Sequence, residues 1–340
     1  MERRAFLVLV SASLLAAPLA AEAQQTGSGS TPRRGGRLPR VGYLGSGHPA
    51  DRSSRLFSYL FEAFADGLRE GGYVDGQTVI VEYRFAEGRF ERLPALAGEL
   101  VRLGVDVIFA TADHTATAAR QATPTIPIVF TAVTDPVARR FTASLSHPGG
   151  NMTGLTLPGP QVTGQLSFLT EAVAKLSRVA VLRNPTGTAH LLHLPGAQKA
   201  AETLRLQFQV FDASSPQDFE RVFVAIANYR AQAVLLLPDS IFYIGREQLA
   251  ELALRHRLPM STNRVEFARA GALMASGSVL SAEWRRAGML VGRILNGSHP
   301  SDIPVEEPTK FEFVINLKTA KAIGLTIPPS LLLRADQVIE

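Results

Sequence analysis

Short apolar runs alternate with segments of helical period along most of this chain. Leucine and phenylalanine recur every three or four residues between the runs, as at Leu93, Leu96 and Leu100. Each run is rich in β-branched or aromatic residues, which is typical of buried strands. In the first half, the pattern predicts strands at 41–44, 79–83, 105–110 and 126–130, separated by helices.

The second half of the chain repeats this pattern about 130 residues later. The strand–helix order is the same, and three runs correspond in type and position: Arg40–Gly45 with Arg178–Arg183, Asp106–Ala110 with Ala233–Leu237, and Ile126–Val129 with Leu258–Ser261. A repeated β–α alternation predicts an α/β protein of two doubly wound parallel-sheet lobes. We expect lobe one to span 40–157 plus about 282–307, and lobe two 158–281 plus about 308–340, joined by a multi-segment hinge.

The first 25 residues have the pattern of an export signal. Arg3-Arg4 precedes an apolar stretch, and Ala21-Glu22-Ala23 is a small-x-small cleavage site, which predicts a signal peptide of residues 1–23 cut after Ala23. The apolar part is too short for the ~20 residues that span a bilayer. The arginine pair fits either general secretion or the twin-arginine route. Residues 24–39 are rich in Gly, Ser, Thr and Arg and predict a disordered leader. Because of the export signal, we expect a periplasmic protein.

Composition removes several classes of function. The 340 residues contain no cysteine, which excludes disulfides, thiol catalysis, thiolate metal sites and a lipid-anchor cysteine. The net charge of +5 is spread along the chain. A nucleic-acid partner is therefore not expected, because such proteins cluster Lys and Arg on one element.

The stretch Thr123–Gly154 carries a family resemblance. Its motifs TIPIVF, DPV, SL and PGGN-x-TG are joined by further matching pieces: Val41–Leu44, Phe64–Tyr73, Glu82–Arg84, Arg92–Pro94, Val105–Ile108, Ile303-Pro304, Ile315–Lys321 and Gly324–Pro328. In this shared order, residues 38–340 resemble the ABC-transporter substrate-binding proteins of the tryptophan/tyrosine-type uptake family. The resemblance implies a periplasmic-binding-protein fold of type I-like form. It also implies capture of a small molecule, an aromatic or other amino acid, for an ABC import permease in the inner membrane. One segment, Ala138–Thr142, departs from the Gly-Leu-Val that relatives usually carry there.

Six loops follow equivalent strand ends and should face one cleft, because ligands bind outside the carboxyl ends of strands in open α/β sheets. Their small polar residues are the predicted ligand-binding set: Ser46, Thr111, Ala112, Asp113, Thr131, Ala132, Asn184, Asp239, Ser240 and Asn263.

Two groups within this set suit the two ends of a zwitterion. Hydroxyls and backbone amides suit a carboxylate, which we assign to Ser46, Thr111, Ala112 and Thr131. Asp239, with Asn184, suits an ammonium group. The alternative for each is a loop cap or turn former. For Asp135, we favour the helix cap. Tyr43, Phe242 and Tyr243 could stack on a ligand, although core packing is the expected role of Tyr43.

No other motif indicates chemistry. Gly45-Ser-Gly-His-Pro-Ala50 imitates a dinucleotide fingerprint, but Pro49 and a polar run separate its glycines from the next helix. His190 and His193 have helical spacing without further metal ligands. No nucleophile motif is present, so we expect no enzyme activity, no cofactor and no metal, and a protein that acts as a monomer. Two alternatives stay open: a ligand-sensing domain of an extracytoplasmic signalling system, and a secreted hydrolase on a doubly wound fold.

Overall fold

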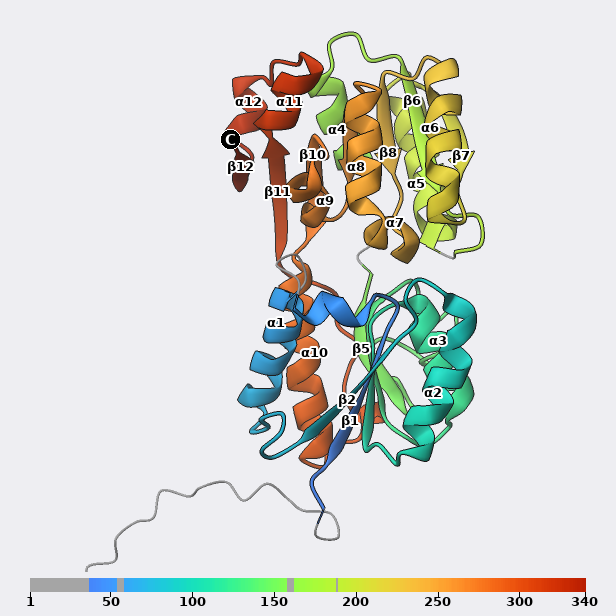
Figure 1. The fold of residues 1–340 in the computed structure, drawn as a ribbon, viewed down its shortest axis with the longest axis vertical. Helices are drawn as coiled ribbons and strands as arrows, with labels where there is room; N and C mark the ends of the chain where they lie inside the picture. The colour runs from blue at the N-terminus through green and yellow to red at the C-terminus, as the bar shows by residue number, and fades with distance from the viewer. Residues whose placement is uncertain (1–36, 54–57, 158–161, 188) are drawn as a thin grey trace, which may run out of the picture. The chain divides into compact units, whose positions relative to one another are not determined.

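The computed structural model describes residues 37–53, 58–157, 162–187 and 189–340 (Figure 1). The predicted signal peptide and residues 24–36 of the predicted leader lie outside the described residues. No helix in the described ranges combines the length and apolar character that a membrane crossing requires.

The first sheet belongs to lobe one and has five parallel strands in the order β2-β1-β3-β4-β5. These strands are β1 (Arg40–Gly45), β2 (Ile80–Phe85), β3 (Val107–Ala110), β4 (Ile128–Val133) and β5 (Met152–Thr156). Helices cover both of its faces: α1 (Ser58–Glu70) and α10 (Leu280–Leu295) on one, and α2 (Leu93–Arg102) and α3 (Asp113–Ala122) on the other. Both faces are therefore buried, which explains the nearly continuous apolar runs of these strands.

The second sheet belongs to lobe two and has seven strands in the order β12-β11-β10-β9-β8-β6-β7. They are β6 (Arg178–Arg183), β7 (Gln207–Asp212), β8 (Ala233–Leu236), β9 (Met260–Thr262), β10 (Met274–Ser278), β11 (Phe311–Asn316) and β12 (Gln337–Ile339). The order β7-β6-β8-β9-β10 repeats β2-β1-β3-β4-β5, which confirms the predicted internal repeat. Beyond the repeat, β11 joins β10 antiparallel, so this sheet is mixed at that edge.

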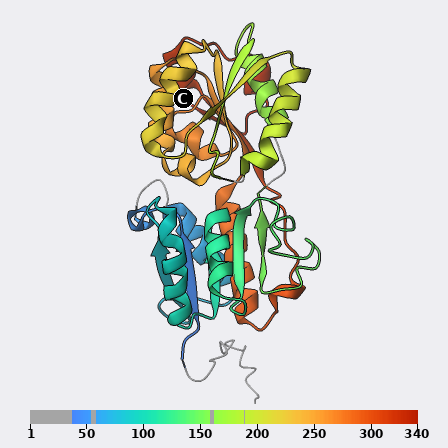
Figure 2. The same cartoon turned by 90° about the vertical axis from the view of Figure 1, so that its right-hand side faces the viewer.

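Helices also cover both faces of the second sheet (Figure 2). One face carries α4 (Val162–Ala172), α5 (Ala189–Thr203), α11 (Leu317–Ile323) and α12 (Pro329–Leu332), and the other α6 (Phe219–Asn228), α7 (Ser240–Ile244) and α8 (Arg246–Arg255). The short α9 (Val265–Ala270) packs beside β10 and β11. The described residues also contain the 3-10 turns η2 (Pro49–Arg52), η3 (Phe90–Arg92), η4 (Pro216–Asp218) and η5 (Pro300–Asp302).

Helix α10 follows lobe two in the chain but packs on α1 in lobe one. The two helices touch at glycines: a Cβ on Gly67 would lie 1.9 Å from the carbonyl oxygen of Arg285, and one on Gly288 would lie 2.3 Å from that of Phe64. Any larger residue at these positions would force the helices apart. After α10, the chain bridges β5 at Leu155 and Glu306 before it returns to lobe two as β11. The chain thus passes between the lobes three times, as a multi-segment hinge.

Candidate functional site

One cavity of about 250 Å3 is lined by residues of both lobes. Its wall is formed by the segments that follow β1, β3 and β4 in lobe one and β8 and β9 in lobe two, with contributions from α1 and α10. These are the carboxyl ends of parallel strands, where open α/β sheets bind ligands. The volume lies just below the ~300–1,000 Å3 of typical ligand pockets and suits a small molecule.

The structure places most of the predicted site residues on this wall. Those that line the cavity are Ser46, Thr111, Ala112, Asp113, Ala132, Asp239, Ser240 and Asn263. Thr131 and Asn184 are buried and do not line it. Asn184 instead accepts the amide of Thr186 (3.0 Å) and hydrogen-bonds Asp239, so it contacts the cavity through that carboxyl group.

A bulge at the end of β4 decides which threonine faces the cavity. Pairing between β4 and β5 shifts register between Phe130 and Val133, and Ala132 has a left-handed φ of 52°. Phe130 and Val133 pack in the same core cluster, although strict alternation would place them on opposite faces. Thr131, before the bulge, is buried in the interior, and Thr134, after the bulge, lines the cavity. The Thr134 hydroxyl is buried and has no hydrogen-bond partner in the described part of the chain, so it is available to a ligand.

Aromatic rings form another part of the wall. Tyr43, Phe61 and Phe85 of lobe one lie beside Trp284 of α10, with 5.8 Å between the Tyr43 and Trp284 ring centroids and 5.6 Å between those of Phe61 and Trp284. The sequence analysis missed Phe61, Phe85 and Trp284, although Trp284 is the single tryptophan of the chain. Such a wall suits an apolar or aromatic group.

The two tyrosines and the phenylalanine singled out for stacking differ in placement. Tyr43 is 2% exposed, contacts five further rings and also lines the cavity, so it serves the core and the wall together. Tyr243 lines the cavity as well. Phe242 is fully buried away from it against Phe219, with 5.9 Å between the ring centroids.

Asp239 is the buried acid on the lobe-two wall. It is the N-cap of α7, and its carboxylate accepts the amide of Ile241 (2.9 Å). Burial raises the pKa of Asp239, the hydrogen bonds from Ile241 and Asn184 and the nearby charge of His114 lower it, and the charge of Asp113 raises it. A cation that enters the cavity would stabilise the ionised form of this carboxyl group and would itself be bound by it.

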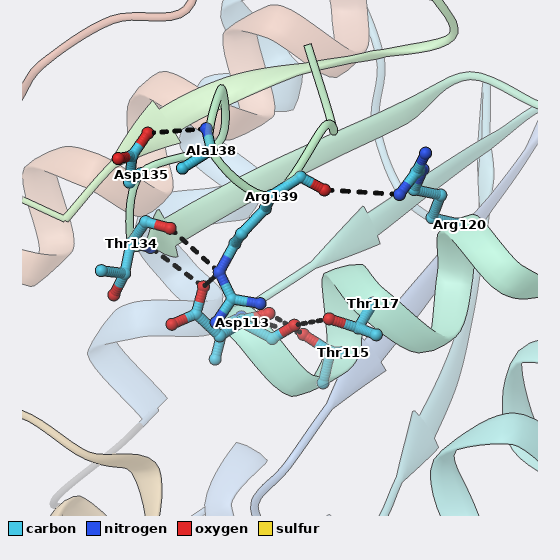
Figure 3. Close-up of polar contacts among 9 residues, drawn as sticks. Asp113, Thr115, Thr117, Arg120, Thr134, Asp135, Ala138 and Arg139 are labelled. Atoms are coloured by element: carbon cyan, nitrogen blue, oxygen red, sulfur yellow. Dashed lines mark hydrogen bonds and ion pairs between the residues drawn. The ribbon is translucent and has the colours of Figure 1, made fainter. Parts of the chain in front are cut away.

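Asp113 lines the lobe-one wall together with Asp51 and Glu87, and it forms an ion pair with Arg139 (Figure 3). The Arg139 Nε is 3.2 Å from Asp113 Oδ1 and donates to the carbonyl oxygen of Thr134 (3.0 Å). Asp113 Oδ1 also accepts the Thr134 amide (2.9 Å). Arg139 belongs to Ala138–Thr142, the segment that the sequence analysis singled out. The predicted helix cap at Asp135 is wrong: Asp135 accepts the Ala138 amide (2.9 Å), but residues 136–140 form a turn that ends at the left-handed φ of Arg140 (57°) and does not continue as a helix.

A buried ion pair lies at the hinge side of the cavity. Arg264, which lines the cavity, donates to Glu283 Oε1 (2.8 Å) and to the Ser278 hydroxyl (2.9 Å). Arg264 follows β9 in lobe two, whereas Glu283 lies on α10. Close by, the hydroxyl of Tyr59 on α1 donates to Glu266 Oε1 on α9 (2.8 Å), which links the two lobes directly.

The histidine pair of α5 shows no metal centre. His193 is buried, and burial together with the charge of Arg264 lowers its pKa to about 4. Across the described ranges, no cluster of three His, Cys, Asp or Glu side chains is arranged to hold a metal ion.

Comparison with known proteins connects this architecture to a family. The model of the family described as ABC transporter substrate binding protein matches residues 57–339. A curated relative from Clostridioides difficile (strain R20291), named tyrosine-binding protein, is 24% identical over 264 residues, which cover 78% of this chain and 76% of the relative.

Solved structures show the same fold. A conserved domain protein from Vibrio cholerae O1 biovar El Tor matches 89% of this chain and 100% of its own, with a TM-score of 0.81 and 26% identity. An ABC domain from Streptococcus pneumoniae, solved in complex with L-Trp, matches with the same coverage and TM-score at 23% identity.

Proposed function

Because this chain belongs to the family of ABC transporter substrate-binding proteins, we propose that it captures an amino acid with an aromatic side chain and delivers it to an ABC import permease. The observation that carries the ligand class is the make-up of the cavity. A buried acid, Asp239, shares a small cavity with an aromatic wall that includes Phe61 and Trp284. The names of two similar proteins, one a tyrosine-binding protein and one solved with L-Trp, support the same class.

The ligand-binding residues follow from this reading. The Asp239 carboxylate, held by Asn184, receives the ammonium group of the amino acid. The carboxylate of the bound amino acid is received by Ser46, Thr111 and the first turn of α3, where helix-terminal amides favour an anion. The amide of Ala112 itself donates to the Thr115 hydroxyl (2.9 Å), so Ala112 contributes shape rather than this donor. The Thr134 hydroxyl adds a polar contact that the sequence analysis had assigned to Thr131.

Binding would act through closure of the lobes. A ligand that touches both walls stabilises the closed arrangement by the contacts it makes only there. The lobe boundaries that we propose are 40–157 with about 282–307, and 158–281 with about 308–340. The protein would work in the periplasm as a monomer, after cleavage behind Ala23, and would release its ligand chemically unchanged.

The test is a thermal-shift screen of the exported protein, with native mass spectrometry to detect co-purified solute. L-tyrosine, L-tryptophan and L-phenylalanine should raise the melting temperature, because a ligand that binds only the folded state stabilises it by mass action. L-leucine and the N-acetylated aromatic amino acids, which lack the ring or the ammonium group, serve as matched controls. Equal shifts with N-acetyl-tyrosine and tyrosine would contradict the role of Asp239, and a ligand recovered in altered form would indicate an enzyme.

A further inference from the structure

The two acids that follow equivalent strands of the repeat differ in their partners. Asp113 lies three residues after the end of β3 (110 to 113), and Asp239 three residues after the end of β8 (236 to 239). Both line the cavity. Asp113 forms an ion pair with Arg139, whereas in the described part of the chain no Lys, Arg or His nitrogen lies within 4.0 Å of the Asp239 carboxylate. Within the described residues, Asp113 therefore has an arginine in an ion pair, whereas Asp239 has no ion-pair partner and the only charge that lowers its pKa is the more distant one of His114.

Arg139 is held tightly enough for its charge to matter. Its side chain is 19% exposed and that of Asp113 is 13% exposed, so solvent screens the pair less than a surface ion pair. The guanidinium spans the Asp113 carboxylate and the Thr134 carbonyl oxygen, while Asp113 accepts the Thr134 amide (Figure 3). These three contacts close a ring between the start of α3 and the end of β4.

The charge of Asp113 lies where an anion should bind. Asp113 is the first residue of α3, directly after Thr111 and Ala112, and its carboxylate is part of the cavity wall. A negative charge at this place would repel a ligand carboxylate at the first turn of α3, unless a cation cancels it. Arg139 is that cation.

Arg139 also fixes the position of Thr134, whose hydroxyl is available to a ligand. The Thr134 hydroxyl is buried, lines the cavity and has no partner within the described ranges. Two residues before it, Ala132 has a left-handed φ of 52°, and directly after it, Asp135 has one of 41°. Such backbone persists only where its surroundings hold it. The two bonds to the Thr134 main chain, from Arg139 and to Asp113, supply part of that hold.

We propose that Arg139 determines the specificity of the cavity: by cancelling the charge of Asp113, it allows the carboxylate of a zwitterionic solute to bind at the first turn of α3, while Asp239 takes the ammonium group. Arg139 acts through Asp113 and is a positioning residue. The inference rests on the proposed function, since it requires a solute that carries both groups. Without Arg139, the cavity should lose its preference for a zwitterion over the corresponding cation.

The experiment compares two solutes that differ only in the carboxylate. L-tyrosine and L-tyrosinamide, and in parallel L-tryptophan and L-tryptophanamide, are titrated calorimetrically at pH 6, where an α-amino group of pKa ~7.7 is protonated. The proteins are the wild type, Arg139→Gln, Arg139→Lys, the double variant Asp113→Asn/Arg139→Gln, and Arg140→Gln as the matched exposed control. The measured quantity is the ratio of the two dissociation constants, amide over amino acid.

We expect Arg139→Gln to lower this ratio about tenfold or more, because it removes a positive charge that pairs with Asp113 near the ligand carboxylate. Arg139→Lys and the double variant should retain most of the wild-type ratio, since each leaves no net charge at Asp113, and Arg140→Gln should not change it. Loss of affinity for both solutes by the same factor in Arg139→Gln would overturn the inference, because it would show a structural role alone. If the wild type bound neither solute of a pair, the proposed function would fail first and the inference with it.

Discussion

The two walls of the cavity start from one repeated plan and end in different chemistry. Each lobe places an acid after its third strand in the repeat order, Asp113 or Asp239, and an arginine after its fourth, Arg139 or Arg264. In lobe one, the arginine turns to the acid of its own lobe (3.2 Å). In lobe two, Arg264 is bound by Glu283 of α10 (2.8 Å), and Asp239 has no ion-pair partner within the described residues. The repeat therefore places acids and arginines after corresponding strands of the two lobes. Contacts between residues far apart in the sequence then decide which of these charges are paired.

The largest effect should come from breaking the buried ion pair between Arg264 and Glu283. Arg264→Met leaves Glu283 buried at 2% exposure without its cation, and this should lower the free energy of unfolding by about 3–5 kcal/mol. Chemical denaturation measures the change. Arg269→Met, on the exposed side of the same helix, is the control and should change stability by less than about 0.5 kcal/mol. Equal effects of the two variants would mean that the Arg264–Glu283 pair does not organise the hinge.

The next effect tests the difference between the two acids themselves. Asp239→Asn keeps an oxygen that can cap α7 but removes the charge, so it should weaken binding of L-tyrosine or L-tryptophan by about 2–4 kcal/mol, as expected for a buried charge pair that loses one partner. Isothermal calorimetry measures the affinity, and the melting temperature without ligand checks the fold.

Asp113→Asn is the matched variant on the other wall. It should alter affinity for these amino acids less than Asp239→Asn does, because Arg139 already compensates Asp113. If the two substitutions weakened binding equally, the asymmetry between the walls would be of no functional consequence.

A third prediction concerns pH, because His193 lies near Arg264 and not near the lobe-one pair. Its pKa is lowered to about 4 by burial and by the charge of Arg264, while the unfolded value is 6.5. Between these values the unfolded chain binds more protons, so stability falls as the pH drops from 6.5 to 4, by roughly 2–3 kcal/mol from this group. Denaturant melts of His193→Leu should lack this part of the pH dependence. The exposed His147→Leu should retain it, and identical pH profiles for wild type and His193→Leu would contradict a neutral buried imidazole.

The smallest effect tests the direct link between the walls. Tyr59→Phe removes the hydrogen bond to Glu266 and should cost about 1–2 kcal/mol, because a buried carboxylate oxygen loses its donor. Tyr73→Phe is the comparison within one lobe, since the Tyr73 hydroxyl donates to Asn296 (3.0 Å). Both should lower stability, but only Tyr59→Phe should alter the affinity for L-tyrosine. An unchanged affinity would show that this bond does not contribute to lobe closure.

The amino-acid sequence alone determined the alternation of strands and helices, the repeat and the loops where a ligand would meet the protein. These features depend on local apolar spacing and on the rule that parallel strands end at one edge of a sheet. For that reason, predicted residues such as Ser46, Asp113 and Asp239 line the same cavity.

Only the tertiary structure decided which side chains face the cavity and which charges remain there. The bulge at Ala132 exchanges Thr131 for Thr134, and a single inserted residue of this kind leaves no mark in a hydrophobic pattern. The return of α10 brings Trp284 to the wall and Glu283 to Arg264, across sequence distances that local spacing does not encode. The pairing of Arg139 with Asp113 likewise joins two loops 26 residues apart (113 to 139), and it depends on the register of the sheet beneath them.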